Sequence, residues 1–89
     1  MEKKIYCPRH AVYLGDYKLL IEFTNGELRI ADLSEVKNEK REAFRELSEV
    51  EYFKQFQIND WSLEWPNGYD IAPDYLYQIS QPVEIKEVG

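Results

Sequence analysis

Cys7 and His10 are the only cysteine and the only histidine of the chain, and both lie in the segment Cys7-Pro8-Arg9-His10. A thiol beside an imidazole could serve as a nucleophile with its base, or as two ligands of a zinc ion. A zinc site needs three or four ligands, and such a nucleophile needs an orienting third group and an oxyanion site. The sequence supplies neither, so we predict a protein without a metal ion, a cofactor or catalytic residues.

Three acidic residues, Glu64, Asp70 and Asp74, suggest acid–base chemistry or a site for a hard cation. Paired carboxylates of the glycosidase kind lie in a deep cleft, which 89 residues hardly provide, and a calcium loop has a denser spacing of oxygen ligands. Asp70 directly precedes Ile71-Ala72-Pro73, where short polar side chains usually bond nearby backbone groups. We therefore predict that Asp70 fastens the loop leading into the last helix.

The surrounding segment EWPNGYDIAPDYLY, residues 64–77, is dense in turn formers and aromatics. We predict that one set of its residues closes the core, namely Trp65, Pro66, Gly68, Asp70, Pro73 and Leu76. Interfaces favour exposed aromatic residues, so the remaining aromatics are candidates for contact with a partner. These are Trp61, Tyr69 and the pair Tyr75 and Tyr77.

The elements that must position these residues begin with a three-stranded meander. Asn25-Gly26 supplies the two positive-φ positions of a two-residue type I′ hairpin turn. This turn sets Phe23 opposite Leu28, Ile21 opposite Ile30 and Glu22 opposite Arg29. A second turn at Gly15-Asp16 sets Leu14 opposite Tyr17 and Val12 opposite Leu19. The predicted core face therefore carries Val12, Leu14, Tyr17, Leu19, Ile21, Phe23, Leu28 and Ile30, and the opposite face a small apolar patch of Ala11, Leu20 and Ala31, with Tyr13 beside it.

Helical segments are predicted to cover the apolar face. Apolar residues recur in 40–54, but Ser48-Glu49-Val50-Glu51 has the pattern of a capping box, which favours two short helices, 40–47 and 49–54, with a bend at Ser48. A second hairpin turns around Asn59-Asp60, with Trp61 in or beside the turn. Pro66-Asn67-Gly68 indicates a further turn. Pro73 then begins a short last helix, because a missing N–H costs nothing at that position, and 81–89 alternates like a strand.

The charge is unevenly distributed. Residues 1–45 carry nine Lys or Arg against eight Asp or Glu, whereas residues 46–89 carry two against nine. An acidic half disfavours binding to a phosphate backbone and suits a basic protein partner. The single cysteine and the lack of long apolar runs predict a cytoplasmic protein with no membrane span.

The order of these elements and the motif W-P-x-G-x-D-x-x-P-x-x-L-Y, running from Trp65 to Tyr77, resemble a small bacterial family known only as a domain of unknown function. The fold of that family resembles the N-terminal domain of a Nitrosomonas regulator-like protein. The resemblance implies an α+β two-layer fold with antiparallel strands and short helices, and it implies no reaction. Some relatives resemble the front half of helix-turn-helix proteins, and others one member of a toxin–antitoxin pair.

We therefore expect residues 1–89 to form a single α+β domain, a meander and a second hairpin packed with two short helical regions. Its expected function is that of a small interaction or regulatory module with a basic protein partner, in its specific form the antitoxin-like half of a pair. One alternative is a small-ligand-binding protein or enzyme that uses the 65–77 loop. Another is an accessory domain of a DNA-binding regulator, although this domain alone is not expected to bind nucleic acid. We also expect a weak homodimer through the sheet face opposite the core.

Overall fold

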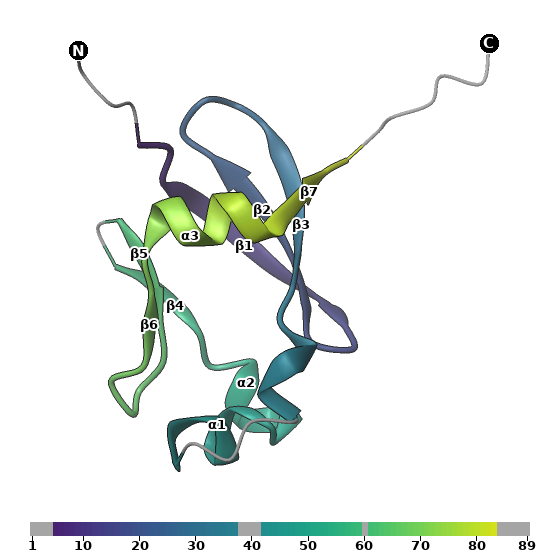
Figure 1. Cartoon of the computed structure of the whole chain (residues 1–89), viewed down its shortest axis with the longest axis vertical. Coiled ribbons are helices and arrows are strands. Elements are labelled where there is room, and N and C mark those ends of the chain that lie inside the picture. The colour runs from purple at the N-terminus through teal and green to yellow at the C-terminus, as the bar shows by residue number, and fades with distance from the viewer. Residues whose placement is uncertain (1–4, 38–41, 60, 84–89) are drawn as a thin grey trace, which may run out of the picture.

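Two antiparallel sheets and three short α-helices make up the protein in a computed structural model that describes residues 5–37, 42–59 and 61–83 (Figure 1). The four-stranded sheet has the order β1 (Pro8–Gly15), β2 (Lys18–Phe23), β3 (Leu28–Asp32) and β7 (Ser80–Pro82). The three-stranded sheet contains β4 (Gln57–Asn59), β5 (Ser62–Glu64) and β6 (Asp70–Ile71). The helices are η1 (Ser34–Lys37, a 3₁₀-helix), α1 (Glu42–Leu47), α2 (Val50–Phe53) and α3 (Pro73–Ile79). The predicted α+β class is confirmed.

The hairpin between β2 and β3 forms where it was expected, but the predicted register is wrong by one residue. Glu22 lies opposite Leu28, and Ile21 lies opposite Arg29. The loop holds three residues, because the N–H of Phe23 donates to the carbonyl of Glu27 at 2.9 Å. Only Gly26 has a positive φ in this loop, of 87°. This is the geometry of a type I turn followed by a glycine bulge rather than of a type I′ turn.

The hairpin between β1 and β2 is also shifted by one residue. Tyr13 lies opposite Leu19, and Gly15 lies opposite Lys18. The turn residues are Asp16 and Tyr17, with φ of 51° and 61°, instead of the predicted pair Gly15-Asp16. A positive φ is unfavourable for a bulky side chain. At Tyr17 the positive φ is accompanied by two long-range contacts of the side chain. The ring packs edge-on against Phe53, and the hydroxyl donates to the carbonyl of Ser48.

These two shifts exchange the faces of β1 and β3 relative to β2. The predicted core positions Val12, Leu14 and Leu28 are 57%, 48% and 41% exposed, and Ile30 is half-buried. Ala31, predicted on the outer face, is fully buried. Ala11 and Tyr13 pack against the core, so of the predicted outer patch only Leu20 lies on the outer face. The core is formed by Tyr17, Leu19, Ile21, Phe23, Ala31, Leu33, Val36, Phe44, Leu47, Phe53, Leu63, Trp65, Ile71 and Leu76.

The helical predictions are confirmed in outline. Two short helices, α1 and α2, flank a bend at Ser48; residues 40 and 41 lie outside the described part of the chain. The predicted cap at Ser48 is wrong, because its hydroxyl donates to the carbonyl of Arg45, and Glu49 occupies the N-cap position without a side-chain hydrogen bond. In the described part of the chain, no helix is both long and apolar enough to cross a membrane.

The second layer lies across the core face of the four-stranded sheet. Figure 1 shows α3 crossing in front of β1 to β3, with the smaller sheet at one side and α1 and α2 at one end. Pro73 begins α3, as predicted, and Leu76 points fully into the core. The expected terminal strand exists as β7, which pairs with β3. Its predicted continuation over 84–89 lies outside the described residues.

Candidate functional site

Trp65 lies at the centre of a chain of aromatic rings that joins the two sheets. Its side chain is 2% exposed, and its indole N–H donates to the carbonyl of Phe53 at 2.8 Å. Its ring centroid lies 5.6 Å from that of Phe53 and 5.9 Å from that of Tyr69. Phe53 in turn contacts Tyr17, and Tyr69 contacts Phe44. Tilted ring pairs at these distances add to the stabilisation from burial, so Trp65 occupies a position that closes the core.

The loop after Trp65 is held by backbone and amide hydrogen bonds. The N–H of Trp65 donates to the carbonyl of Tyr69 at 2.8 Å, and the N–H of Gly68 donates to the carbonyl of Trp65 at 2.9 Å. Gly68 has a φ of 92°, which explains the need for glycine. The side-chain oxygen of Asn67 accepts the N–H of Tyr69, and its amide donates to Glu46 of α1. Asn67 therefore ties the loop both to itself and to a helix.

The acidic residues Asp70 and Asp74 take no part in the hydrogen bonds that hold this loop. Asp70 is exposed and lies directly opposite Glu64, because β6 pairs with β5. The N-cap of α3 is Ala72, with no side-chain hydrogen bond, and Asp74 accepts the N–H of the adjacent Tyr75. The predicted role of Asp70 is therefore wrong, since its strand position keeps the carboxylate in solvent. Asn67 performs that role instead, and its position before a positive-φ glycine is the signal that could have revealed it.

The other residues assigned to closing the core occupy different environments. Pro66 and Gly68 are exposed in the loop, Pro73 is half-buried at the start of α3, and Leu76 is fully buried. The motif is thus a loop and a helix start whose buried anchors are Trp65 and Leu76.

Two of the four candidate contact aromatics are strongly exposed. Trp61, in the turn between β4 and β5, is 67% exposed, and Tyr75, in the first half of α3, is 48% exposed. Leu63 of β5 pairs with Ile71, the last residue of β6. Trp61 lies two residues before Leu63, and α3 begins two residues after Ile71, so the segments that carry the two exposed rings extend from the same end of the β5–β6 pair.

The other two candidates, Tyr69 and Tyr77, are half-buried and pack on the core. The ring of Tyr77 contacts Phe23 edge-on at 5.0 Å and Tyr6 at 5.2 Å. The guanidinium carbon of Arg29 lies 4.0 Å from the centroid of the same ring. A role of Tyr69 or Tyr77 in partner contact stays a prediction, and much of each ring is already occupied by intramolecular packing.

A polar network around Tyr77 links the β2–β3 turn to α3 and β7. The Tyr77 hydroxyl donates to Glu27, whose carboxylate also accepts the amide of Asn25 at 2.6 Å and one nitrogen of Arg29 at 3.3 Å. Arg29 donates further to the hydroxyl and the carbonyl of Ser80, both at 2.7 Å. We did not anticipate this network, because the predicted register placed Arg29 on the outer face. The buried residues Ala31 and Leu33, at the same strand parity, are the signal that could have placed it inside.

This network shifts the pKa values of two of its members, Glu27 and Tyr77. The hydrogen bonds from Tyr77 and Asn25 hold the pKa of Glu27 below its ordinary value of 4.5. The bond to Glu27 also raises the pKa of Tyr77 above 10.0. Glu27 is therefore an anionic acceptor and Tyr77 a protonated donor at neutral pH. In this arrangement the Tyr77 hydroxyl is the donor of an internal hydrogen bond.

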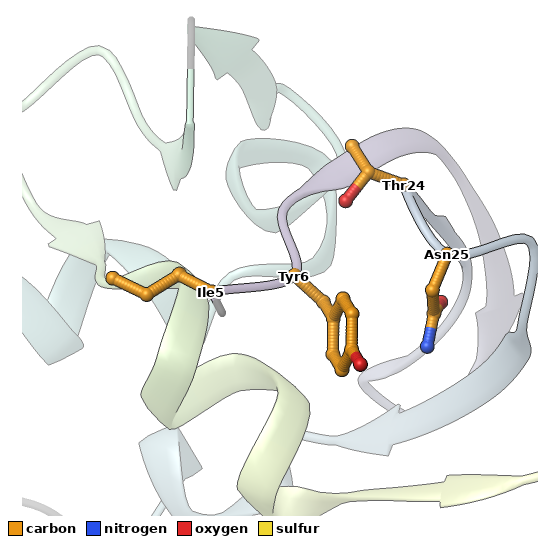
Figure 2. A pocket seen from close by; sticks show the side chains of 4 residues that line it. All are labelled: Ile5, Tyr6, Thr24 and Asn25. Atoms are coloured by element: carbon orange, nitrogen blue, oxygen red, sulfur yellow. The ribbon is translucent and has the colours of Figure 1, made fainter. Parts of the chain in front are cut away.

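The described surface has at least two hollows. The first, of about 180 Å³, lies beside the 65–77 loop and is lined by Gln57, Glu64, Trp65 and Pro66. It is smaller than the roughly 300 Å³ at which ligand pockets begin. The second measures about 540 Å³ and is a shallow depression lined by Ile5, Tyr6, Thr24 and Asn25. Figure 2 shows Tyr6 and Asn25 pointing the same way there, whereas Ile5 extends away from them.

The cysteine and the histidine have different partners. The backbone N–H of Cys7 donates to the hydroxyl of Thr24 at 3.1 Å. His10 is exposed on the outer face of the sheet, 4.0 Å from Glu22. Among the described residues, no group of three or more His, Cys, Asp or Glu side chains is arranged to hold a metal ion.

Residues 8–82, from the start of β1 to the end of β7, match the model of a family described as "Protein of unknown function (DUF2442)". The comparison with curated proteins and that with solved structures found no match.

Proposed function

The chain belongs to DUF2442, a family of proteins of unknown function, and we propose that it acts as a protein–protein interaction module whose contact surface is formed by Trp61 and Tyr75. The 67% exposure of Trp61 is the observation that carries this proposal. An indole in water is costly for a monomer, and tryptophan and tyrosine are the residues that most often dominate binding energy at interfaces. The second tryptophan, Trp65, is buried in the same fold, so the fold has room for a buried indole and Trp61 is exposed because of its position in the β4–β5 turn.

The charges around this surface favour a basic partner. Asp74 is exposed one residue before Tyr75, and Asp70 is exposed on the neighbouring strand β6. Residues 46–89 carry nine acidic and two basic residues. Aromatic anchors in an acidic field steer a cationic partner towards the surface, and the rings then hold it by packing.

A binding role accounts for the Trp65–Tyr77 motif better than an enzymatic one. Trp65 and Leu76 are buried, Asn67 fastens the loop, and Tyr77 is used in an internal hydrogen bond. The hollow beside the loop holds about 180 Å³, little room for a substrate. The specific form we propose is the neutralising or regulatory half of a pair. The resemblance to a regulator's N-terminal domain supports a regulatory role. In the alternative form of this proposal, the chain would act as an accessory domain of a DNA-binding regulator.

Affinity capture from the native host tests the proposal, with quantitative mass spectrometry on three baits. These are the wild type, Trp61→Ala, and the matched control Val50→Ala, which alters another exposed apolar residue (40% exposed) on α2. We expect a basic protein in stoichiometric amount with the wild type and with Val50→Ala, and its loss with Trp61→Ala.

The purified pair then provides the quantitative measurement. Trp61→Ala should weaken binding by about 2 kcal/mol, roughly thirtyfold. Asp74→Lys should mainly slow association, because a charge at the edge of an interface acts on encounter rather than on dissociation. An acidic partner, or one that binds the Trp61→Ala variant as tightly as the wild type, would show that this surface is not the functional one.

A further inference from the structure

The outer face of the four-stranded sheet carries aliphatic side chains in an ordered pattern. Val12, Leu20 and Ile30 form a row across β1, β2 and β3, because Val12 pairs with Leu20 and Leu20 with Ile30. Leu14 and Leu28, 48% and 41% exposed, lie on either side of this row. The helix α3 and the buried residues of β2 occupy the other face (Figure 1). These five residues, the outer aliphatic patch, therefore lie on a sheet face that the core does not use.

Charged residues flank the outer aliphatic patch at both ends. Lys18 pairs with Asp32 on one side of the central row, and Glu22 lies opposite His10 on the other side. Lys18 and Glu22 are on the same strand, each two residues from Leu20. The patch thus has opposite charges at equal distances from its centre.

We propose that a second copy of the chain covers this face, in a symmetric dimer whose two-fold axis runs across the strands along the Val12–Leu20–Ile30 row. This axis places Leu20 against Leu20 and reverses the strand direction of the second sheet. Lys18 then faces Glu22 of the second copy, and by symmetry Glu22 faces Lys18 of the second copy. A two-fold interface uses the same patch of both copies, so the attraction between Lys18 and Glu22 occurs twice in each dimer.

The charge pattern selects this axis over the other face-to-face arrangement. An axis running along β2 would set Lys18 opposite Lys18 and Glu22 opposite Glu22, and like charges across an interface are costly. The patch also suits an identical copy better than a strongly charged partner, since its flanking charges nearly balance. Sheets that pack face to face interdigitate aliphatic side chains in this way. The dimer leaves the layer that carries Trp61 on the far side of each copy, so the particle would present two such surfaces.

Sedimentation equilibrium of charge-reversed variants tests the proposal. The wild type should show a concentration-dependent monomer–dimer equilibrium. Lys18→Glu and Glu22→Lys should each weaken self-association at least about tenfold, because each creates two like-charge contacts. An equimolar mixture of the two variants should associate again, since both contacts between positions 18 and 22 in the mixed dimer then join opposite charges. Circular dichroism of each variant checks that the fold is retained.

A second pair of variants tests the patch itself. Leu20→Lys should abolish the dimer, whereas Val50→Lys, at an exposed apolar site on α2, should leave it unchanged. A wild type that stays monomeric up to about 1 mM would overturn the proposal. So would a mixture of the two charge variants that associates no better than either variant alone. Trp61→Ala should dimerise like the wild type, so failure here and failure of the partner surface can be told apart.

Discussion

The turns at 24–26 and 66–68 have the same backbone and different surroundings. In each, the residue before the turn donates to the carbonyl four residues later, at 2.9 Å for Phe23 and 2.8 Å for Trp65. In each, an asparagine oxygen accepts the N–H two residues later, at 3.1 Å for Asn25 and 3.0 Å for Asn67. The glycines that follow have φ of 87° and 92°. Two Asn-Gly pairs with unrelated neighbours therefore fold into one kind of loop.

The residue after each glycine determines what the loop does. Glu27 follows the first turn and enters a polar network with Tyr77 and Arg29. Tyr69 follows the second and stacks into the aromatic chain beside Trp65. Local hydrogen bonding thus fixes the shape of both loops, whereas the next side chain decides between a polar connection to α3 and closure of the core.

Replacing the closing tryptophan should have the largest effect. Trp65→Ala should lower the free energy of unfolding by about 3–5 kcal/mol, because it removes a buried aromatic ring and leaves a cavity. Chemical denaturation gives the value. Trp65→Phe is the matched control: it keeps a ring but leaves the carbonyl of Phe53 without its 2.8 Å donor, at a cost of about 1–3 kcal/mol. A midpoint near that of the wild type in the alanine variant would contradict closure by Trp65.

The two glycines test whether the loops are equivalent. Gly26→Ala and Gly68→Ala should each cost about 1–2 kcal/mol, since a side chain disfavours positive φ. The backbone strain is the whole cost, because an added Cβ meets no atom within 4 Å at either position. Asparagine at the same sites should cost less. Thermal or chemical unfolding that gives very different losses at the two positions would show that the surroundings, and not the shared turn, set the strain.

Glu27 should make the first loop sensitive to pH. Its pKa is lowered in the folded protein, so its contribution to stability is present above the ordinary value of 4.5 and is lost as the pH falls through the lowered pKa. Glu27→Gln should therefore be less stable than the wild type at neutral pH, with the difference narrowing below pH 4.5. Denaturation over a pH series measures this. In a Tyr77→Phe background, which lacks the main donor, the pH-dependent part of the difference should shrink.

Trp61 should have the smallest effect on stability. Trp61→Ala should change the free energy of unfolding by less than about 0.5 kcal/mol, because a largely exposed side chain loses little packing. The same denaturation experiment as for Trp65 gives a direct contrast between two tryptophans four residues apart. A loss above 1 kcal/mol, on the order of a buried contact, would mean that Trp61 packs on its own chain and is not free for a partner.

Much of the fold could be predicted from local sequence. Asn25-Gly26 and Pro66-Asn67-Gly68 located two turns, Ser48 located the bend between two helices, and Pro73 located the start of α3. Each of these depends on interactions within a few residues, which a single sequence displays. Of the candidate site, the exposed position of Trp61 was anticipated as a turn residue, whereas the Glu27–Tyr77 network was not, because its members are 50 residues apart.

The sequence by itself determined, to within about one residue, where the chain turns, and only the tertiary structure decided which side chains face the core. β1 and β3 are apolar at both strand parities: Val12 and Leu14 alternate with Ala11 and Tyr13, and Leu28 and Ile30 are followed by Ala31 and Leu33. A one-residue slip therefore exchanges one apolar face for another, and the alternation cannot select the register. Long-range contacts select it, because Tyr17 reaches Phe53 and Ser48, and Arg29 reaches Tyr77 and Ser80, in the observed register.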